Sequence, residues 1–102
     1  MSTNSANLGS AAELLGRPWT MLIIDALDQG PLRFNEIVRQ LPGISTNLLS
    51  ERLRQLQSTG VVTRNAATSS RAVSYELTTL GKRLTPILGD LADWASRLRW
   101  ST

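Results

Sequence analysis

The sequence contains no cysteine and no histidine. The absence of cysteine excludes disulfides, thiolate metal sites and thiol-based redox sensing. The absence of histidine removes the usual general base, the usual zinc ligand and the usual pH switch near neutrality. Proton transfer would depend on carboxylates, the single lysine Lys82 and the single tyrosine Tyr75. The composition therefore argues against an enzyme, and we expect no catalytic residue, no metal site and no cofactor.

Long hydrophobic runs are also missing. The longest apolar stretch, Met21 to Ile24, is far too short to span a bilayer, and residues 1–11 lack the features of a secretory signal. At 102 residues the chain is most simply one domain, with a modest core that pairing with a second copy would help. We therefore expect a cytoplasmic protein with a flexible lead-in over residues 1–10 and a single domain over residues 11–102.

Charge is unevenly distributed along the chain. The net charge is only +3, but residues 31–71 carry six arginines against two glutamates. Arginine suits phosphates and base edges because its planar group donates two parallel hydrogen bonds. The arginine excess indicates either a segment that binds nucleic acid or an ordinary solvated surface.

Hydrophobic periodicity and turn residues predict five helices and a β-hairpin. The expected helices cover residues 10–16, 18–29, 34–41, 45–59 and 79–100, and the expected strands cover residues 61–65 and 72–77. A minor strand over residues 32–34 could complete a three-stranded sheet. Two helices joined by a tight Gly-containing turn and followed by a hairpin indicate a winged helix-turn-helix, so the predicted fold is mainly α with a small β-hairpin.

Several residues are expected to mark where these helices begin, end or bend. Ser10 and Ser45 are the expected N-caps of their helices, and Gly16 is expected to end the first helix. Pro18 is tolerated in a first turn, and Pro86 should bend or split the last helix. The predicted apolar face of the second helix comprises Trp19, Leu22, Ile23, Ala26 and Leu27.

The helix over residues 45–59 carries the clearest functional pattern. Three leucines, at positions 49, 53 and 56, form a narrow apolar stripe on one side. At about 100° per residue, the side chains pointing away from this stripe are polar. They are Asn47, Glu51, Arg54 and Gln55.

A helix-turn-helix reads bases in the major groove with the N-terminal residues of its second helix. Asn47 could pair with adenine and Glu51 could accept from cytosine N4, whereas Arg52 and Arg54 suit phosphates. The full set of candidate DNA contacts, including the wing, is Arg33, Ser45, Thr46, Asn47, Ser50, Glu51, Arg52, Arg54, Arg64, Ser70 and Arg71. The alternative for each residue is a solvated side chain. Glu51 argues against DNA binding unless it meets a base donor or pairs with a neighbour such as Arg54.

The terminal helices indicate that a second copy of the chain is a partner. The last helix is longer than so small a core can cover, and Trp94 and Trp100 fall near the chain end. The predicted dimer interface comprises Leu8, Leu14, Leu15, Leu84, Ile87, Leu88, Leu91, Trp94 and Leu98. The alternative is that Trp94 folds back onto its own domain. A small apolar effector could also fit between the core and the last helix, although no residue pattern marks one.

Three segments of the chain resemble the HxlR-type winged-helix transcriptional regulators, relatives of the MarR-like group. They read "LLGRPWTMLIIDAL", "GPLRFNEIVRQLPGISTNLLSERLRQLQSTGVVTR" and "VSYELTTLGKRLTPILGDLADW", and they extend over roughly residues 11–95. The resemblance implies a homodimeric DNA-binding regulator without enzymatic activity, dimerising through its N-terminal and C-terminal helices. It also implies that residues 45–59 form the recognition helix and residues 65–71 the wing.

The chain departs from this family pattern at several positions. Many members carry a cysteine near the N-terminus, but none is present here, so thiol sensing cannot be transferred. Residues 16–20 read Gly-Arg-Pro-Trp-Thr where the family tends to have Gly-Gly-Lys/Arg-Trp-Thr. Glu51 stands where glutamine is common, and the wing lacks the proline often found there. The last two differences bear on the operator sequence.

The sequence therefore leaves two functions to compare. The first is a sequence-specific regulator that binds double-stranded DNA as a homodimer. The second is a winged-helix module for protein–protein interaction that has lost DNA binding, which Glu51 and the low net charge favour. No motif supports an enzyme.

Overall fold

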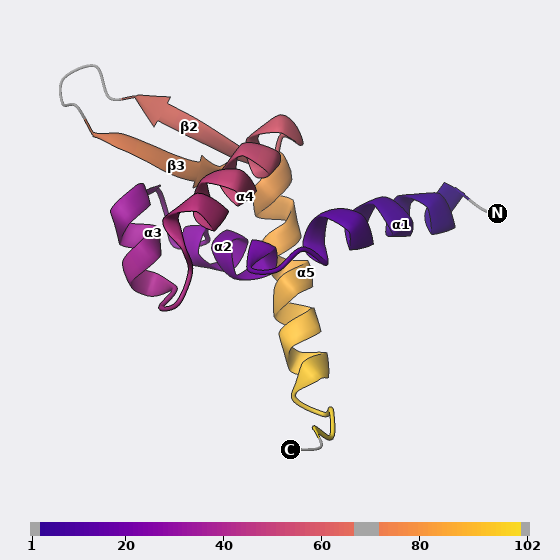
Figure 1. Cartoon of the computed structure of the whole chain (residues 1–102). Coiled ribbons are helices and arrows are strands. Elements are labelled where there is room, and N and C mark those ends of the chain that lie inside the picture. The colour runs from indigo at the N-terminus through magenta and orange to yellow at the C-terminus, as the bar shows by residue number, and fades with distance from the viewer. Residues whose placement is uncertain (1–2, 67–71, 101–102) are drawn as a thin grey trace.

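The computed structural model describes residues 3–66 and 72–100. Its elements are α1 (Thr3–Leu15), α2 (Thr20–Leu27), β1 (Leu32–Arg33), α3 (Phe34–Gln40), α4 (Thr46–Ser58), β2 (Val62–Ala66), β3 (Val73–Leu77) and α5 (Thr79–Ala95) (Figure 1). The prediction of a mainly α fold with a small sheet is confirmed. The minor strand is also confirmed, because β1 pairs with β3.

The sheet is antiparallel, with strand order β1-β3-β2. Tyr75 in the central strand pairs with Leu32 on one side and with Arg64 on the other. Helices α2, α3 and α4 pack against one another and against this sheet. The buried core comprises Ile23, Ile24, Leu27, Ile37, Ile44, Leu49, Leu53, Leu56, Val61, Val62 and Leu77.

Glycine sets the chain direction on both sides of α4. Gly43, in the turn between α3 and α4, has φ 99°, and Gly60, just after α4, has φ 82°. Both values lie in the left-handed region that glycine adopts without steric cost. The side chain of Thr78 then donates a 2.6 Å hydrogen bond to the Gly60 carbonyl and accepts from the Gly81 backbone N–H, which caps α5.

The predicted start of the first helix at Ser10 is wrong, because α1 already begins at Thr3. Residues 3–10 of the expected lead-in are therefore helical. Ser10 does not cap the helix; its hydroxyl donates to the Ala6 carbonyl, one turn earlier. Such back-bonding lets serine occupy a helix interior. The predicted end is confirmed, since Gly16 follows the last helical residue.

The second helix starts two residues later than its Pro18 signal suggested. Residues 17–20 form a turn closed by the Thr20 backbone N–H and the Arg17 carbonyl, and α2 begins at Thr20. Trp19 precedes the helix with φ 74°, a conformation that is strained for a bulky side chain. Leu22, expected on the apolar face, is 52% exposed, whereas Ile23 and Leu27 are buried as predicted.

Pro86 does not split the last helix, which runs unbroken from Thr79 to Ala95. A proline inside a helix leaves the carbonyl four residues earlier without its N–H donor. Here the Thr85 hydroxyl donates to that carbonyl, on Lys82, at 3.0 Å. The helix ends at Ala95 instead of extending to Trp100 as predicted, and Ser96 is its C-cap.

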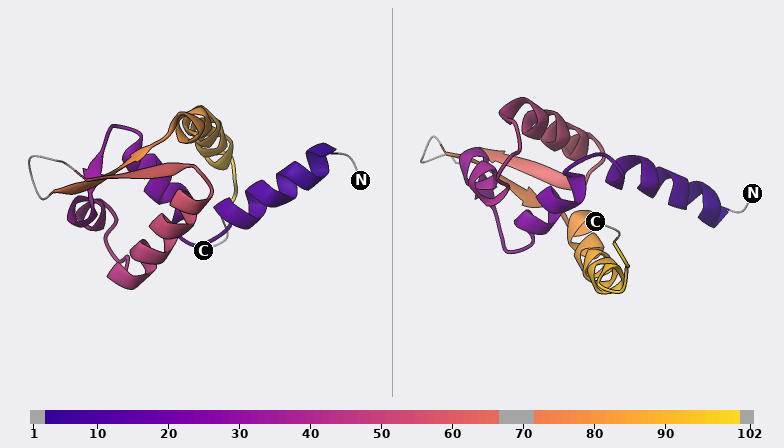
Figure 2. Two further views of the ribbon diagram at one scale, coloured as in Figure 1. Left: turned by 90° about the horizontal axis from the view of Figure 1, so that it is seen from above. Right: turned by 60° about the horizontal axis from the view of Figure 1, so that its bottom comes forward.

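Two arms give the molecule an extended shape. Helices α1 and α5 project from the body in different directions in Figures 1 and 2, and the Cα radius of gyration is 14.9 Å. A compact chain of this length would have about 13 Å. Within residues 3–66 and 72–100, no helix is both long and apolar enough to cross a membrane.

Candidate functional site

Helix α4 presents one polar side to the surroundings and buries the other. Leu49, Leu53 and Leu56 are each no more than 1% exposed and anchor the helix in the core. The outer face of α4, the name used from here on, consists of exposed residues: Thr46, Asn47, Ser50, Glu51 and Arg54. Asn47, Glu51 and Arg54 are therefore exposed as predicted, whereas Gln55, also predicted to point away from the leucines, is half-buried and accepts from Arg52.

The start of α4 is capped as predicted. The Ser45 side chain accepts a 3.1 Å hydrogen bond from the Leu48 backbone N–H, and Ser45 itself is exposed. The remaining free N–H groups of the first turn point out of the helix end, together with the positive end of its dipole. Thr46 and Asn47 lie in that turn. This end of α4 therefore suits contact with a negatively charged or acceptor-rich partner.

Arg52 does not lie on the outer face, so its prediction as a phosphate contact is not supported. It is only 8% exposed, and its Nε donates a 3.0 Å hydrogen bond to the Pro18 carbonyl oxygen. The physical reason is its position three residues after Leu49 and one before Leu53, which places it beside the apolar stripe. This spacing was visible in the sequence.

Glu51 also finds a different partner from the expected one. Its Oε1 lies 3.6 Å from an Arg52 terminal nitrogen, and its side chain remains 56% exposed. The same Arg52 nitrogen donates to Gln55 Oε1 at 3.4 Å. Arg52 thus touches both neighbours, whereas Arg54, predicted to pair with Glu51, is exposed on the outer face.

Two further candidate arginines lie on the sheet. Arg33 is exposed in β1, and its backbone N–H donates a 2.8 Å hydrogen bond to Glu36 Oε1 at the start of α3. Arg64 is exposed in β2 and pairs with Tyr75 across the hairpin. The other wing candidates, Ser70 and Arg71, fall outside the described residues.

The sequence did not reveal that the connection between α1 and α2, residues 16–19, packs against the helix-turn-helix. The Trp19 ring lies against the turn of the helix-turn-helix, since a Cβ on Gly43 would stand 3.7 Å from Trp19 Cη2. Pro18 contacts α4 through Arg52. The sequence signal for Trp19 was its apolar character alone, which does not reveal which distant residue it meets.

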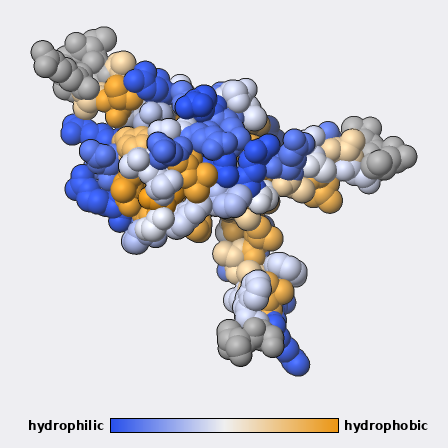
Figure 3. All heavy atoms as spheres, in the orientation of Figure 1, coloured by the Kyte–Doolittle hydropathy of each residue, from blue (hydrophilic) through white to orange (hydrophobic). Residues whose placement is uncertain are grey.

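The predicted dimer residues fall into two groups. Leu14, Leu15, Leu84 and Leu88 are half-buried and pack against the core. The others are exposed: Leu8, Ile87, Leu91, Trp94 and Leu98. Trp94 is 59% exposed, so the alternative that it folds back onto its own domain is not what the structure has. Figure 3 shows apolar side chains along both arms.

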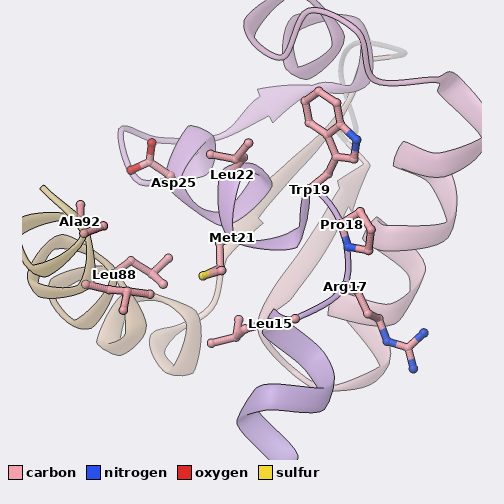
Figure 4. Close-up of a pocket in the computed structure, with 12 residues that line it drawn as sticks. Leu15, Arg17, Pro18, Trp19, Met21, Leu22, Asp25, Leu88 and Ala92 are labelled. Atoms are coloured by element: carbon pink, nitrogen blue, oxygen red, sulfur yellow. The ribbon is translucent and has the colours of Figure 1, made fainter. Parts of the chain in front are cut away.

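Grooves lie beside both arms. An apolar groove of about 770 Å³ separates α1 from α5, with Leu14, Leu80, Leu84 and Ile87 among its lining residues. A second groove, of about 530 Å³, lies between α2 and α5 and is drawn in Figure 4. Its walls include Leu15, Met21, Leu22, Leu88 and the connection formed by residues 16–19. Among the described residues, no cluster of three acidic side chains offers a metal site.

Comparison with known proteins places the chain among regulators of one type. The model of the family described as "HxlR-like helix-turn-helix" matches residues 14–101. The uncharacterized HTH-type transcriptional regulator YvaP of Bacillus subtilis (strain 168) is 41% identical over 87 residues, 84% of this chain and 81% of YvaP. The HTH-type transcriptional regulator YodB of the same organism is 36% identical over 97 residues, 94% of this chain and 87% of YodB.

Two solved structures share the fold over nearly the whole chain. The reduced form of YodB from B. subtilis superposes with a TM-score of 0.85 at 35% identity, covering 96% of this chain and 94% of that one. The redox regulator HypR in its oxidized form gives a TM-score of 0.82 at 28% identity, covering 93% of this chain and 99% of HypR. Both arms and the body are included in these overlaps.

Proposed function

Because this chain belongs to the HxlR-like helix-turn-helix family, whose curated members are transcriptional regulators, we propose that it binds double-stranded DNA sequence-specifically as a homodimer. In this proposal α4 is the recognition helix and the β2–β3 hairpin is the wing. Its site of action is then the cytoplasm, where it works by binding and not by catalysis.

The outer face of α4 is the observation that carries this proposal. Its five residues are polar and exposed, while the opposite side of the helix is anchored in the core. An α-helix of about 10–12 Å diameter fits the major groove of B-DNA, which is about 12 Å wide. A rigid helix with short polar side chains near its N-terminus is what base readout requires.

The individual contacts follow from side-chain chemistry. Asn47 can make two hydrogen bonds with adenine, and Glu51 can accept from the cytosine N4 amino group. Thr46 and Ser50 offer hydroxyls to base edges, and Ser45 lies where phosphate would meet the helix end. Arg54, Arg33 and Arg64 supply positive charge for phosphates, and we assign phosphate contacts in the wing to the Arg71 charge and the Ser70 hydroxyl.

Surface area supports a dimer through the arms. The chain has 7434 Å² of accessible surface, whereas a compact monomer of its mass would have about 5,700 Å². Helices α1 and α5 expose large apolar side chains including Leu8, Ile87 and Trp94. Stable dimers commonly bury at least about 800 Å² on each partner, so the excess over a compact monomer is sufficient.

Regulation by cysteine oxidation is not part of the proposal. Relatives have been solved in reduced, quinone-bound and oxidized forms, but those forms belong to YodB and HypR. This chain contains no cysteine, so any signal that it receives must act without a thiol.

Selection of bound duplexes from a random pool, combined with measurement of particle mass, tests the proposal. We expect a pseudo-palindromic site with half-sites about one helical turn apart. Arg54→Ala should lower affinity for every duplex. It should also reduce the slope of log K against log salt by about 0.9 for each phosphate that the arginine no longer neutralises.

The matched control is Arg99→Ala, which removes an exposed arginine beyond the end of α5 and should leave the slope unchanged. If the wild-type chain binds no duplex even at low salt, the DNA-binding proposal fails. The protein-interaction module would then be the better description.

A further inference from the structure

Arg52 joins two parts of the molecule that are far apart in sequence. Its guanidinium Nε reaches the Pro18 carbonyl in the α1–α2 connection at 3.0 Å, although the two residues are 34 positions apart. On α4 itself, one terminal nitrogen meets Gln55 Oε1 at 3.4 Å and Glu51 Oε1 at 3.6 Å. One side chain therefore holds the base of arm α1 and two neighbours on α4 together.

Burial makes these contacts obligatory for Arg52. Its side chain is only 10% exposed, and a charged group withdrawn from water needs partners for its donors. Arginine satisfies several acceptors at once because its donors form a rigid, planar fork. The guanidinium can keep its partners only while Pro18, Glu51 and Gln55 hold their relative positions.

The α1–α2 connection, to which Arg52 is hydrogen-bonded, has a constrained conformation. Trp19, next to Pro18, has φ 74°, and its ring lies against Gly43 in the turn that leads into α4. Figure 4 shows the connection from Leu15 to Trp19 passing from the end of α1 to the start of α2. The connection therefore contacts both the turn before α4 and, through Arg52, the second turn of α4.

We propose that Arg52 is a positioning residue for DNA readout, which orients Glu51 on the outer face of α4 and locks that helix to the base of arm α1. Arg52 makes no contact with DNA itself. This inference rests on the proposed function. A buried arginine would then influence base preference by positioning Glu51. The same arginine would couple the position of arm α1 to that of the recognition helix.

The first experiment compares Arg52→Met and Arg52→Lys with Arg54→Ala on the selected duplex and on duplexes changed at single bases. Methionine keeps the apolar stem without donors, and lysine keeps the charge without the planar fork. We expect both Arg52 variants to lose about tenfold in preference for the selected base opposite Glu51, with an unchanged salt slope. A phosphate contact would give the reverse pattern: a lower slope in Arg52→Met, rescue by lysine, and unchanged base preference. That pattern would overturn the proposal.

A double-mutant cycle tests whether Arg52 acts through Glu51. Glu51→Ala should abolish the base preference, and adding Arg52→Met should then change the preference little, so the combined loss is smaller than the product of the single losses. Losses that multiply independently would contradict the proposed route. If Arg52→Met does not fold, the same cycle with Arg52→Lys decides the question.

Hydrogen exchange in the free protein provides a test that does not need DNA. Arg52→Met should speed amide exchange in residues 16–20 and also in the first two turns of α4, because the Arg52–Pro18 hydrogen bond connects the two segments. Unchanged exchange in either segment would contradict this connection, even if the wild-type protein proves not to bind DNA. Failure of the wild type to bind duplex, with the exchange result as expected, would reject the proposed function and confine Arg52 to joining α1 and α4.

Discussion

Gly81, in the first turn of α5, shows how a single residue can set the distance between two segments. It is buried, and a Cβ at this position would collide with the backbone carbonyl oxygen of Val61 and crowd the side chain of Leu77. The same carbonyl of Val61 accepts from the Thr78 backbone N–H at 3.0 Å. The start of α5 therefore approaches the start of the hairpin as closely as a glycine allows.

Gly81→Ala should lower the free energy of unfolding by about 1–3 kcal/mol, because the added methyl group forces backbone atoms apart. Urea denaturation monitored by circular dichroism measures this change. Gly89→Ala is the matched control in the same helix, since a Cβ there meets no atom within 4 Å. Alanine at Gly89 should instead raise stability, by about 0.5–1 kcal/mol, through its higher helix propensity. Equal effects of the two substitutions would refute the proposed collision.

At the level of the single element, α4 shows how local signals define a helix completely. Ser45 caps it, the leucines at positions 49, 53 and 56 hold it in the core, and Gly60 follows its C-cap with a positive φ. Each signal acts within one or two turns of the residue that produces it. This is why the boundaries predicted from the sequence match the observed helix.

Ser45→Ala should destabilise the fold by about 0.5–2 kcal/mol, because the Leu48 backbone N–H loses its acceptor. The midpoint of urea unfolding should fall while the m-value stays constant. Ser50→Ala, an exposed interior position of the same helix, is the control and should change stability by less than about 0.5 kcal/mol. A Ser45→Ala protein as stable as wild type would mean that water caps the helix equally well.

The other helices show where local signals were insufficient. Nothing in residues 3–9 distinguishes a frayed lead-in from a helix that is part of an arm, so the true start of α1 was missed. Pro86 was expected to interrupt α5, but Thr85 satisfies the carbonyl that proline leaves free. Leu22 fits the apolar period of α2, yet it is exposed beside the groove between α2 and α5.

For the molecule as a whole, shape and exposed apolar surface both argue for a second copy. The extents of 47 × 37 × 23 Å reflect two arms that leave a small body. The proposed dimer would cover the groove between these arms and their leucines, and it would place the two copies of α4 in a symmetric pair.

A dimer also predicts that thermal stability depends on protein concentration. If folding and association are coupled, Tm should rise by about 3 °C for each tenfold increase in concentration. Ile87→Glu places a carboxylate in the groove between α1 and α5 and should abolish this dependence, giving the mass of a monomer in sedimentation equilibrium. Lys82→Glu, an exposed position of α5 away from that groove, is the control and should retain it. A wild-type Tm independent of concentration, with monomeric mass, would rule out this dimer.

Residues close together in the chain set the available chemistry and most of the local structure. The lack of cysteine and histidine, the cap at Ser45, the leucine stripe and the change of period at the hairpin could all be read without coordinates. The same patterns placed Asn47, Glu51 and Arg54 on the exposed side of α4, but they did not show that Arg52 is buried and Gln55 half-buried. Folding in three dimensions was needed to bring distant segments together: Arg52 with Pro18, and Trp19 with Gly43. These contacts depend on how the elements pack against one another. A pattern of neighbouring residues carries no information about a contact between residues 34 positions apart.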